Sequence, residues 1–296
     1  MNSFDEILTK AKSLRKKKIV IVAAEDLHVL EAIKIATEIG FVIPIFSGKI
    51  DQVIDLSKKI NFDISQFEKF DITDSEASSI FAVNFIREKK ADILMKGKVT
   101  TLTLLRAVVD KYHGLTKGNL LSHFAIHQLP SYHKLLAITD AAMNIKPNLE
   151  EKVEILKNAL EVLLKLGYDN PKIAVLCPVE SVNPKIESTV HASQLTNMNR
   201  NNQITGCIID GPLALDNAIS KEAALLKGIK GEVAGDADLL LTPDLDSGNI
   251  LYKAINFLAG GISAGIITGA NSPIVLSSRS DSKLSKLYSI ALAACL

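Results

Sequence analysis

The fold of this chain is decided at its last strand-to-helix junction, residues 271–282, which read NSPIVLSSRSDS. The apolar run at 274–276 predicts a short buried strand, and helically spaced apolar residues follow between 284 and 294. The junction carries two hydroxyls (Ser277, Ser278), a guanidinium (Arg279) and a carboxylate (Asp281). Strand-to-helix turns lie at the carboxyl edge of a sheet, where ligands of open α/β sheets bind. Because the first helical turn offers free N–H groups and a positive dipole, the sequence predicts an anion site.

A simpler interpretation applies to any Ser-Arg-x-Asp sequence at the start of a helix. Ser280 or Asp281 would then be the helix N-cap, and Arg279 would be a solvated surface residue. The rest of the chain has to decide between the two interpretations.

Length and composition limit the classes of protein that this chain can belong to. Its 296 residues fit two domains at about 150 residues each. The 34 basic and 33 acidic residues leave a net charge of +1, which argues against a nucleic-acid-binding or membrane-surface protein. Three scattered cysteines show neither metal spacing nor a disulfide framework, and the charged N-terminus does not resemble a signal peptide. We therefore expect a cytoplasmic protein whose cysteines are core residues.

Strand and helix patterns alternate through both halves of the chain. This alternation predicts an α/β fold with parallel strands covered by helices on both faces. Two further apolar stretches, 122–127 and 134–138, read as strands joined by a short hairpin-like link. The other expected strands are 19–24, 41–46, 70–72, 91–95, 173–177, 204–209 and 238–241, and the expected helices are 27–39, 50–60, 75–88, 102–111, 149–166, 186–198 and 250–259.

A second candidate anion site follows the strand at 91–95. It reads Lys96-Gly97-Lys98-Val99-Thr100-Thr101 and combines positive charge, a glycine that permits close backbone approach and hydroxyls at a helix start. The spacing is not that of a nucleotide-triphosphate loop, and a surface turn with two lysines is an equally good interpretation of this stretch alone.

Six polar clusters each follow an expected strand, which is more than helix capping alone requires. A cleft lined by strand ends from two domains explains them most simply. Three histidines, His123, His127 and His133, are interpreted as structural or surface residues, because no acidic residue stands between the first two as in a His-Glu-x-x-His metal motif. The six clusters are 96–101, 139–144, 178–184, 210–216, 243–249 and 277–281.

In five of these regions the sequence resembles the phosphate acyltransferase family, specifically its phosphate butyryltransferase branch. The resemblance runs from about residue 18 to the C-terminus, and five motifs in the same order make a chance match improbable. The motifs are KGKVTT (96–101), TDAAMN (139–144), IDGPL (209–213), PDLDSGNI (243–250) and SRSDS (278–282).

The resemblance implies transfer of a short acyl group between coenzyme A and inorganic phosphate. It also implies two α/β domains around a cleft, as in isocitrate and isopropylmalate dehydrogenases, with the C-terminal segment completing the first domain. We accordingly expect a first domain of residues 1–125 plus 275–296 and a second of residues 126–274. Coenzyme A or acyl-CoA and phosphate or acyl phosphate would be substrates, with no separate cofactor and no metal. A homodimer or higher homo-oligomer is implied as well.

The chemistry of such a transfer assigns roles within the last junction. Asp281 is the candidate base for the thiol, Ser278 the donor to the tetrahedral oxyanion, and Arg279 the clamp for phosphate. In the acetyl-transferring relatives the base lies further along the helix, where this chain has Ser285, so Asp281 or another group must replace it. By the resemblance, Arg106 contacts an anion.

The remaining substrate contacts come from two of the motifs. We expect them at Lys96, Gly97, Lys98, Thr100, Thr101 and Asn249. Lys96 or Lys98 would compensate for a second arginine of the acetyl branch that this chain lacks.

Two alternatives remain open at this point. A metal- and NAD-dependent β-decarboxylating dehydrogenase of the same fold would use clustered aspartates such as Asp244 and Asp246. A non-catalytic module that binds acyl-CoA or acyl phosphate would need no base. The intact Ser-Arg-x-Asp sequence favours an enzyme.

Overall fold

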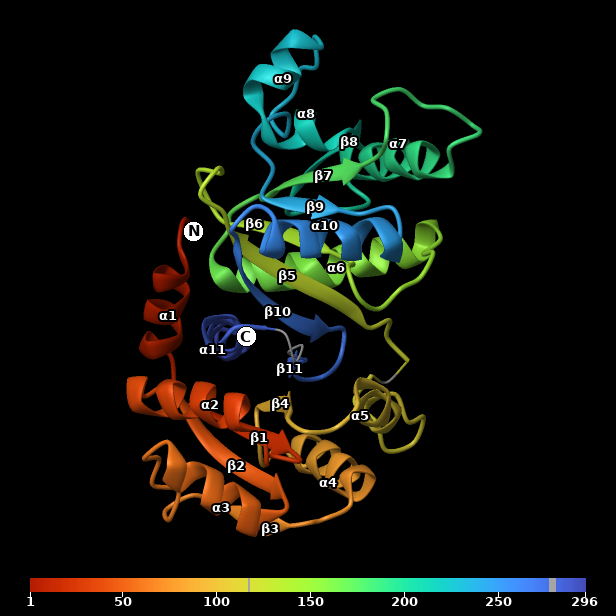
Figure 1. Ribbon diagram of the computed structural model, residues 1–296. Helices are drawn as coiled ribbons and strands as arrows, with labels where there is room; N and C mark the ends of the chain where they lie inside the picture. Colours follow the sequence, from red (N-terminus) through yellow and green to blue (C-terminus); the bar gives the residue numbers. More distant parts are fainter. Residues whose placement is uncertain (117, 277–280) are drawn as a thin grey trace. The chain divides into compact units, whose positions relative to one another are not determined.

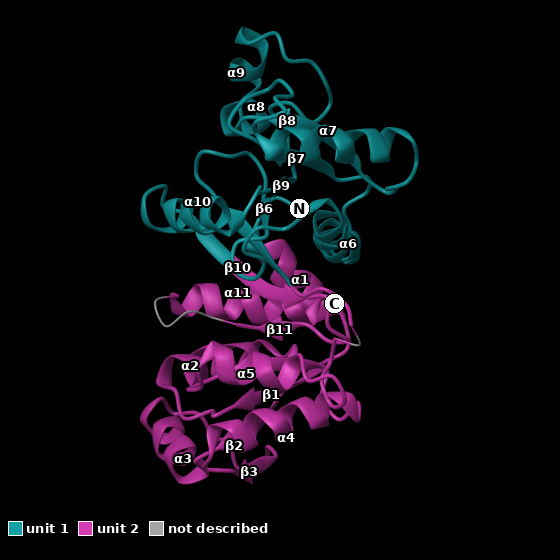
Figure 2. Cartoon of the chain, turned by 90° about the vertical axis from the view of Figure 1, so that its right-hand side faces the viewer, with its two compact units in different colours: residues 1–4, 122–263 teal, residues 5–121, 264–296 magenta. Residues whose placement is uncertain are grey.

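The computed structural model describes residues 1–116, 118–276 and 281–296. The chain forms two compact units, coloured teal and magenta in Figure 2. Unit 1 contains residues 1–4 and 122–263, and unit 2 contains residues 5–121 and 264–296. The units thus divide the chain at 121/122 and 263/264, whereas the sequence placed the breaks at 125/126 and 274/275.

Unit 2 is built on strands in the order β3-β2-β1-β4-β11-β10 (Figure 1). The first five are parallel to one another, and β10 is antiparallel to β11. Apolar residues on β1 and β4 are completely buried, as expected for strands covered on both faces. The strands are β1 (Lys17–Val22), β2 (Val42–Gly48), β3 (Lys69–Asp71), β4 (Ile93–Lys96), β10 (Ile262–Thr268) and β11 (Ile274–Val275).

The helices of unit 2 cover both faces of this sheet. The chain moves outward from β1 to β3 and then returns to β4, so right-handed crossovers place α2 and α3 on one face and α4 on the other. The C-terminal helix α11 packs against α2. The end of the chain therefore returns to this unit and completes it. The helices are α1 (Phe4–Ser13), α2 (Leu27–Ile39), α3 (Ile50–Lys59), α4 (Ser75–Arg87), α5 (Thr101–Val108) and α11 (Lys283–Ala294).

The strands of unit 1 follow one another in the order β5-β6-β9-β7-β8. Strands β6, β9, β7 and β8 are parallel, and β5 is antiparallel to β6. The predicted pair of strands at 122–127 and 134–138 is confirmed by this antiparallel pairing. The strands are β5 (Ser122–Gln128), β6 (Leu136–Thr139), β7 (Lys172–Leu176), β8 (Ile208–Leu213) and β9 (Leu239–Leu241).

Capping residues in the sequence mark the start and the end of the longest helix of unit 1, α6. Helix α6 starts at a capping box formed by Asn148 and Glu151 and ends at Gly167, whose φ of 98° lies in the left-handed region. Two short helices, α8 and α9, were not predicted. No helix in the described part of the chain combines the length and the apolar character needed to cross a membrane. The helices are α6 (Leu149–Leu166), α7 (Glu187–Arg200), α8 (Leu215–Ile219), α9 (Lys221–Leu226) and α10 (Leu245–Phe257).

All three cysteines are buried and free, which confirms the prediction that they are core residues. Burial raises the pKa of Cys207 and of Cys295 to about 11. Both thiols are therefore protonated near neutral pH and are poor nucleophiles.

Candidate active site

Two of the polar clusters leave neighbouring strand ends of unit 2. Strand β11 lies parallel to β4, with Ile274 opposite Leu94 and Val275 opposite Met95. Lys96 is the last residue of β4 and Leu276 is the first residue after β11, so the two adjacent strands end at the same edge of the sheet. This pairing joins positions about 180 residues apart in the sequence at the place where open α/β sheets bind ligands.

The turn that begins at Lys96 is fastened to the end of β1. The N–H groups of Gly97 and Lys98 donate to the carbonyl oxygens of Val22 and Ala23, at 2.9 and 2.7 Å. The side chain of Lys96 is 8% exposed, and its Nζ donates to the carbonyl oxygens of Gly97 and Val99, at 3.3 and 3.2 Å. The Lys96 ammonium thus holds its own turn, whereas Lys98 is exposed.

Gly97 is required by packing. A Cβ atom at this position would lie 2.4 Å from the carbonyl oxygen of Ala23 and 2.6 Å from that of Val22. These are rigid backbone atoms, so no side chain fits. The structure therefore explains this glycine by the close approach of β1, and a ligand contact at Gly97 stays a prediction.

The paired threonines begin helix α5. Thr100 is the N-cap, and its Oγ1 accepts a hydrogen bond from the Thr103 N–H at 3.1 Å. The Oγ1 atoms of Thr100 and Thr103 lie 2.8 Å apart and share a hydrogen bond. Thr101, the first helical residue, is exposed. Hence the Thr100 hydroxyl is engaged in capping, and that of Thr101 is the more accessible of the pair.

Arg106 lies further along α5, on the surface that faces α4. It lines a pocket of about 460 Å³ together with Arg87, Asp110 and His113. Arg87 Nη1 lies 2.9 Å from His113 Nδ1. This pocket lies along the helix pair, and none of the residues at 96–101 line it. The anion contact assigned to Arg106 stays a prediction.

The last junction is described only in part. Ser278 and Arg279 lie outside the described residues. Asp281 is described and half-buried, and its carbonyl oxygen accepts a hydrogen bond from Lys286 Nζ at 2.7 Å. The N-cap of α11 is Ser282, whose hydroxyl accepts from the Ser285 N–H at 3.1 Å. Ser282 is therefore the N-cap, and not Ser280 or Asp281 as the simpler interpretation has it. The other part of that interpretation, Arg279 as a solvated surface residue, falls on a position outside the described residues.

In unit 1, four polar clusters lie at the carboxyl ends of β6, β7, β8 and β9, which share one edge because the strands are parallel. The strand before the cluster at 210–216 extends further than expected, so residues 210–213 belong to β8 itself. Asp140 is 3% exposed, and its carboxylate accepts from the N–H groups of Ala142, Met143 and Asn144. Asn249 Nδ2 donates to the carbonyl oxygen of Ala141 at 3.1 Å. Asn249 therefore fastens α10 to the Asp140 turn, and its predicted substrate contact is untested.

A pocket of about 670 Å³ opens at this edge of unit 1. Its lining includes three lysines, Lys146, Lys152 and Lys185, none of which was predicted as a site residue. The signal was present in the sequence, because Lys152 falls on the apolar stripe of α6 in register with Ile155 and Leu156. A lysine at a core position of an amphipathic helix indicates a specific role for its charge.

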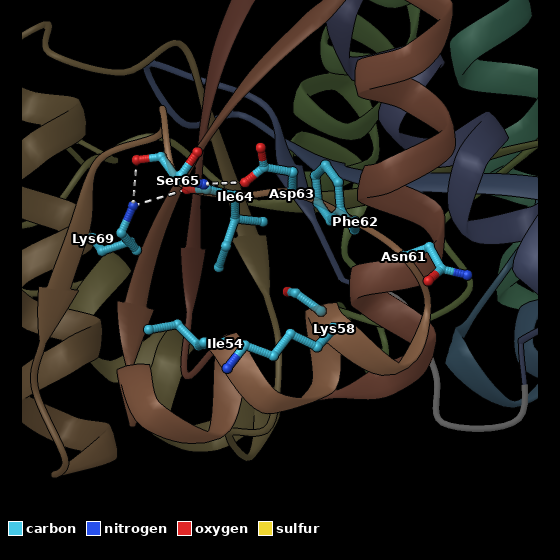
Figure 3. A pocket seen from close by; sticks show the side chains of 9 residues that line it. Ile54, Lys58, Asn61, Phe62, Asp63, Ile64, Ser65 and Lys69 are labelled. Atoms are coloured by element: carbon cyan, nitrogen blue, oxygen red, sulfur yellow. Dashed lines mark hydrogen bonds between the residues drawn. The ribbon is translucent and has the colours of Figure 1, made fainter.

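Another pocket, of about 540 Å³, lies between α3 and the loop at 60–69 in unit 2 (Figure 3). Lys69 Nζ donates to the carbonyl oxygens of Ile64, Ser65 and Phe67 at 2.8, 3.1 and 2.6 Å. The apolar side chains of Phe62 and Ile64 form part of the wall (Figure 3). None of the predicted site residues lines this hollow, so it has no part in the candidate site.

The histidines of β5 are internal. His127 is fully buried, its Nδ1 lies 3.0 Å from Ser263 Oγ, and Nε2 has no hydrogen-bond partner among the described residues. The ring of Tyr252 meets both His123 and His127 edge-on. Burial, together with the nearby His123, lowers the pKa of His127 to about 3, so His127 is neutral near pH 7. His133 is exposed and pairs with Asp236 at 2.9 Å.

Asp244, one of the two aspartates named for a metal-dependent dehydrogenase, caps a helix. Asp244 is the N-cap of α10 and accepts hydrogen bonds from the N–H and Oγ of Ser247, at 2.9 and 2.6 Å. The described residues contain no cluster of three or more His, Cys, Asp or Glu side chains suited to a metal ion. The Asp244 carboxylate is explained by helix capping.

Comparison with known proteins identifies the family. Residues 73–294 match the model of the family described as "Phosphate acetyl/butaryl transferase". A phosphate butyryltransferase from Clostridium beijerinckii is 44% identical over 99% of this chain and 97% of its own length, and one from Clostridium acetobutylicum is 42% identical over 99% and 98%. A branched-chain phosphotransacylase from Enterococcus faecalis superposes with a TM-score of 0.83 at 34% identity, over 94% of this chain and 98% of its own. The chain belongs to the phosphate acetyl/butyryl transferase family, an acyltransferase family, and not to the dehydrogenases.

Proposed function

We propose that this chain transfers a butanoyl group reversibly between coenzyme A and inorganic phosphate, in the reaction butanoyl-CoA + phosphate = butanoyl phosphate + CoA. The single observation that carries the proposal is the parallel pairing of β11 with β4. It brings the chain leading to Ser278 and Arg279 out of the sheet beside Lys96. The names of the relatives at 42% and 44% identity supply the acyl group.

The reaction proceeds by direct attack while both substrates are bound. Asp281 accepts the proton of the coenzyme A thiol, and the thiolate sulfur attacks the carbonyl carbon of the acyl phosphate. The carbon–oxygen bond to phosphate then breaks, and phosphate leaves with the bonding electron pair. Only a few per cent of a thiol with a pKa of about 8.5 is ionised at pH 7, so a positioned base accelerates this step. Holding both substrates together removes the need for a covalent acyl-enzyme.

Ser278 and Arg279 complete the proposed machinery. Ser278 donates to the oxyanion of the tetrahedral intermediate, and Arg279 grips two phosphate oxygens at once. Asp281 is proposed as the base because it is the carboxylate of the Ser-Arg-x-Asp sequence at this junction.

The proposal extends to the remaining expectations. Coenzyme A is a substrate, and no separate cofactor or metal takes part. An isocitrate dehydrogenase-like fold and a cytoplasmic homodimer or higher homo-oligomer are part of the proposal. Exposed apolar residues on α10, Ile250 and Phe257, which are 69% and 68% exposed, support association with a second copy.

A thiol-release assay with acetyl-, propanoyl-, butanoyl- and branched acyl-CoA tests the function. We expect phosphate-dependent release of coenzyme A, with butanoyl-CoA among the best substrates. Arg279→Ala should lower kcat/KM by about 1,000-fold, because the phosphate clamp is lost, while the thermal midpoint stays within about 2 °C. Full activity of Arg279→Ala would refute the assigned role, and release with acetyl-CoA alone would refute the butanoyl assignment.

A further inference from the structure

The pocket of about 670 Å³ in unit 1 is built around a buried lysine. Lys152 is 4% exposed and lines the pocket from helix α6. Its Nζ lies 3.0 Å from His191 Nδ1. Among the described residues no carboxylate oxygen lies within 4 Å of this ammonium, so Lys152 forms no ion pair there. An imidazole nitrogen that accepts from an ammonium is neutral, so the charge of Lys152 has no counter-charge in direct contact.

Burial of such a charge is unfavourable unless something compensates it. Burial lowers the pKa of Lys152, which means that the folded protein opposes the charged form. Proteins keep buried charges when they are paired. A lysine in this position therefore points to an anion that is supplied from outside the chain.

The other charges of the pocket leave this role open. Glu187 pairs with Lys146 at 3.0 Å. The Asp244 carboxylate is occupied by the N–H and hydroxyl of Ser247. Lys185 is exposed at the rim, and no carboxylate of the described chain pairs with it. The two acidic groups are thus already engaged, and Lys152 and Lys185 remain to meet an anion.

Helix α7 adds a second source of positive potential. Its 14 residues begin at Glu187, and its N-cap, Ile186, provides no side-chain hydrogen bond to the first turn. Residues on either side of this helix start, Lys185 and Ser188, line the pocket. An uncapped helix N-terminus leaves N–H donors for an anion.

The size and the walls of the pocket indicate what kind of anion it accepts. Its volume lies within the range of about 300–1,000 Å³ that is usual for sites of small organic ligands, and it far exceeds a single phosphate ion. Apolar and proline side chains share the lining with the lysines: Pro147, Leu176, Pro178, Leu215, Pro243 and Leu251. A ligand that combines phosphate with uncharged parts matches both features.

We infer that this pocket binds a phosphate group of coenzyme A, with Lys152 as its buried cation and Lys185 at its rim. The inference rests on the proposed function for the identity of the ligand. Phosphate groups also reach the enzyme as inorganic phosphate, so the experiment must separate the two sources.

Equilibrium binding to the full chain tests the inference without any need for turnover. Titration calorimetry is carried out with coenzyme A, 3′-dephospho-coenzyme A, pantetheine and inorganic phosphate. Lys152→Met keeps most of the length of the side chain and removes its charge. We expect it to weaken coenzyme A roughly 10- to 100-fold, because one charge-assisted contact is lost, and to leave pantetheine, which has no phosphate, unchanged. Lys157→Met, on the exposed side of the same helix, should leave the affinities for coenzyme A and for pantetheine unchanged.

The ligand series locates the source of the phosphate. If Lys152→Met weakens the binding of coenzyme A but not that of 3′-dephospho-coenzyme A, the 3′-phosphate lies in the pocket. If it weakens the binding of both ligands, the diphosphate lies there. Weakened binding of inorganic phosphate with unchanged coenzyme A would overturn the inference. Equal weakening of pantetheine, or coenzyme A binding within twofold of wild type, would overturn it as well.

A second variant keeps the test decisive if Lys152→Met does not fold. Lys185 is exposed, so Lys185→Gln leaves the core intact, and we expect it to weaken coenzyme A about threefold, in keeping with a partly screened charge. An unchanged affinity for coenzyme A in Lys185→Gln would then contradict the inference. Absence of phosphate-dependent acyl transfer by the wild type would refute the proposed function alone, whereas these titrations judge the pocket separately.

Discussion

Each unit of this chain buries a lysine near the carboxyl edge of its sheet, and the two lysines are bonded in different ways. Lys96 in unit 2 donates to the carbonyl oxygens of Gly97 and Val99 and so fixes the turn that carries it. The Lys152 ammonium in unit 1 has the ring of His191 as its one hydrogen-bond partner among the described residues. The first lysine contributes to the native structure, whereas the second carries a burial cost that a ligand can offset. Burial of a charge therefore does not by itself identify a binding residue, and the groups that surround the charge must be counted.

The largest effect is expected at the turn that Lys96 holds. Gly97→Ala would place a Cβ 2.4 Å from the carbonyl oxygen of Ala23, so β1 and the turn must separate. We expect the free energy of unfolding to fall by about 3 kcal/mol or more, measured by urea denaturation. Gly206→Ala is the matched control, because its Cβ meets nothing within 4 Å and only the backbone strain at a φ of 78° remains. It should cost about 1 kcal/mol, and equal losses would show that the contact with β1 is unimportant.

Exchange of each buried lysine for methionine tests the comparison itself. Lys96→Met leaves two carbonyl groups without their donor and should lower the free energy of unfolding by about 2 kcal/mol. Lys152→Met removes an uncompensated buried charge and should leave it unchanged or raise it. Denaturation of both variants in the absence of ligand measures the difference. If Lys152→Met is the more destabilising of the two, the contrast between the lysines is wrong.

A third buried basic group, His127, makes the free energy of unfolding depend on pH. Its pKa of about 3 in the folded protein lies below the usual value of about 6.5, because burial disfavours the charged ring. The unfolded chain therefore binds a proton below pH 6.5 that the folded chain does not bind until about pH 3, and stability falls as the pH falls through this window. The expected loss from this residue is about 1.4 kcal/mol per pH unit.

Unfolding between pH 7 and pH 4.5 measures this dependence. His127→Gln, which cannot titrate, should flatten the curve, whereas His28→Gln at an exposed position should not. An unchanged slope in His127→Gln would show that this ring does not dominate the acid response.

The smallest effect is expected at the cap of α5. Thr100→Ala removes the oxygen that accepts from the Thr103 N–H, which typically costs about 1 kcal/mol. Thr100→Ser keeps the cap and should restore most of the stability in thermal unfolding. A loss of coenzyme A or phosphate binding in Thr100→Ala that Thr100→Ser does not restore would indicate a role for the threonine methyl group.

Much of this architecture follows from local sequence patterns. Continuous apolar runs predicted buried parallel strands such as β1 and β4, and Asn148 and Gly167 marked the ends of α6. The position of β11 beside β4 could not be derived from the pattern, since the sequence of a two-residue strand does not indicate which strand it pairs with. Only the resemblance to a family placed the C-terminal segment with the first domain.

The candidate site was predictable to a smaller extent. The motif at 96–101 indicated a turn at a strand end, but spacing could not show that Lys96 bonds to its own turn or that Thr100 caps a helix. Helices α8 and α9 escaped prediction because residues 213–237 have no clear helical period. Lys152 does not follow a strand but lies within an apolar helical stripe, so the pattern of polar clusters at strand ends does not indicate it.

In the proposed reaction phosphate, and not water, receives the acyl group of the thioester. The most direct measurement follows coenzyme A release from butanoyl-CoA by the purified wild-type chain, with and without inorganic phosphate, and quantifies butanoyl phosphate in the same samples. We predict negligible release without phosphate and, with phosphate, one butanoyl phosphate formed for each coenzyme A released. Release at the same rate without phosphate, or release that yields free butanoate, would contradict the account.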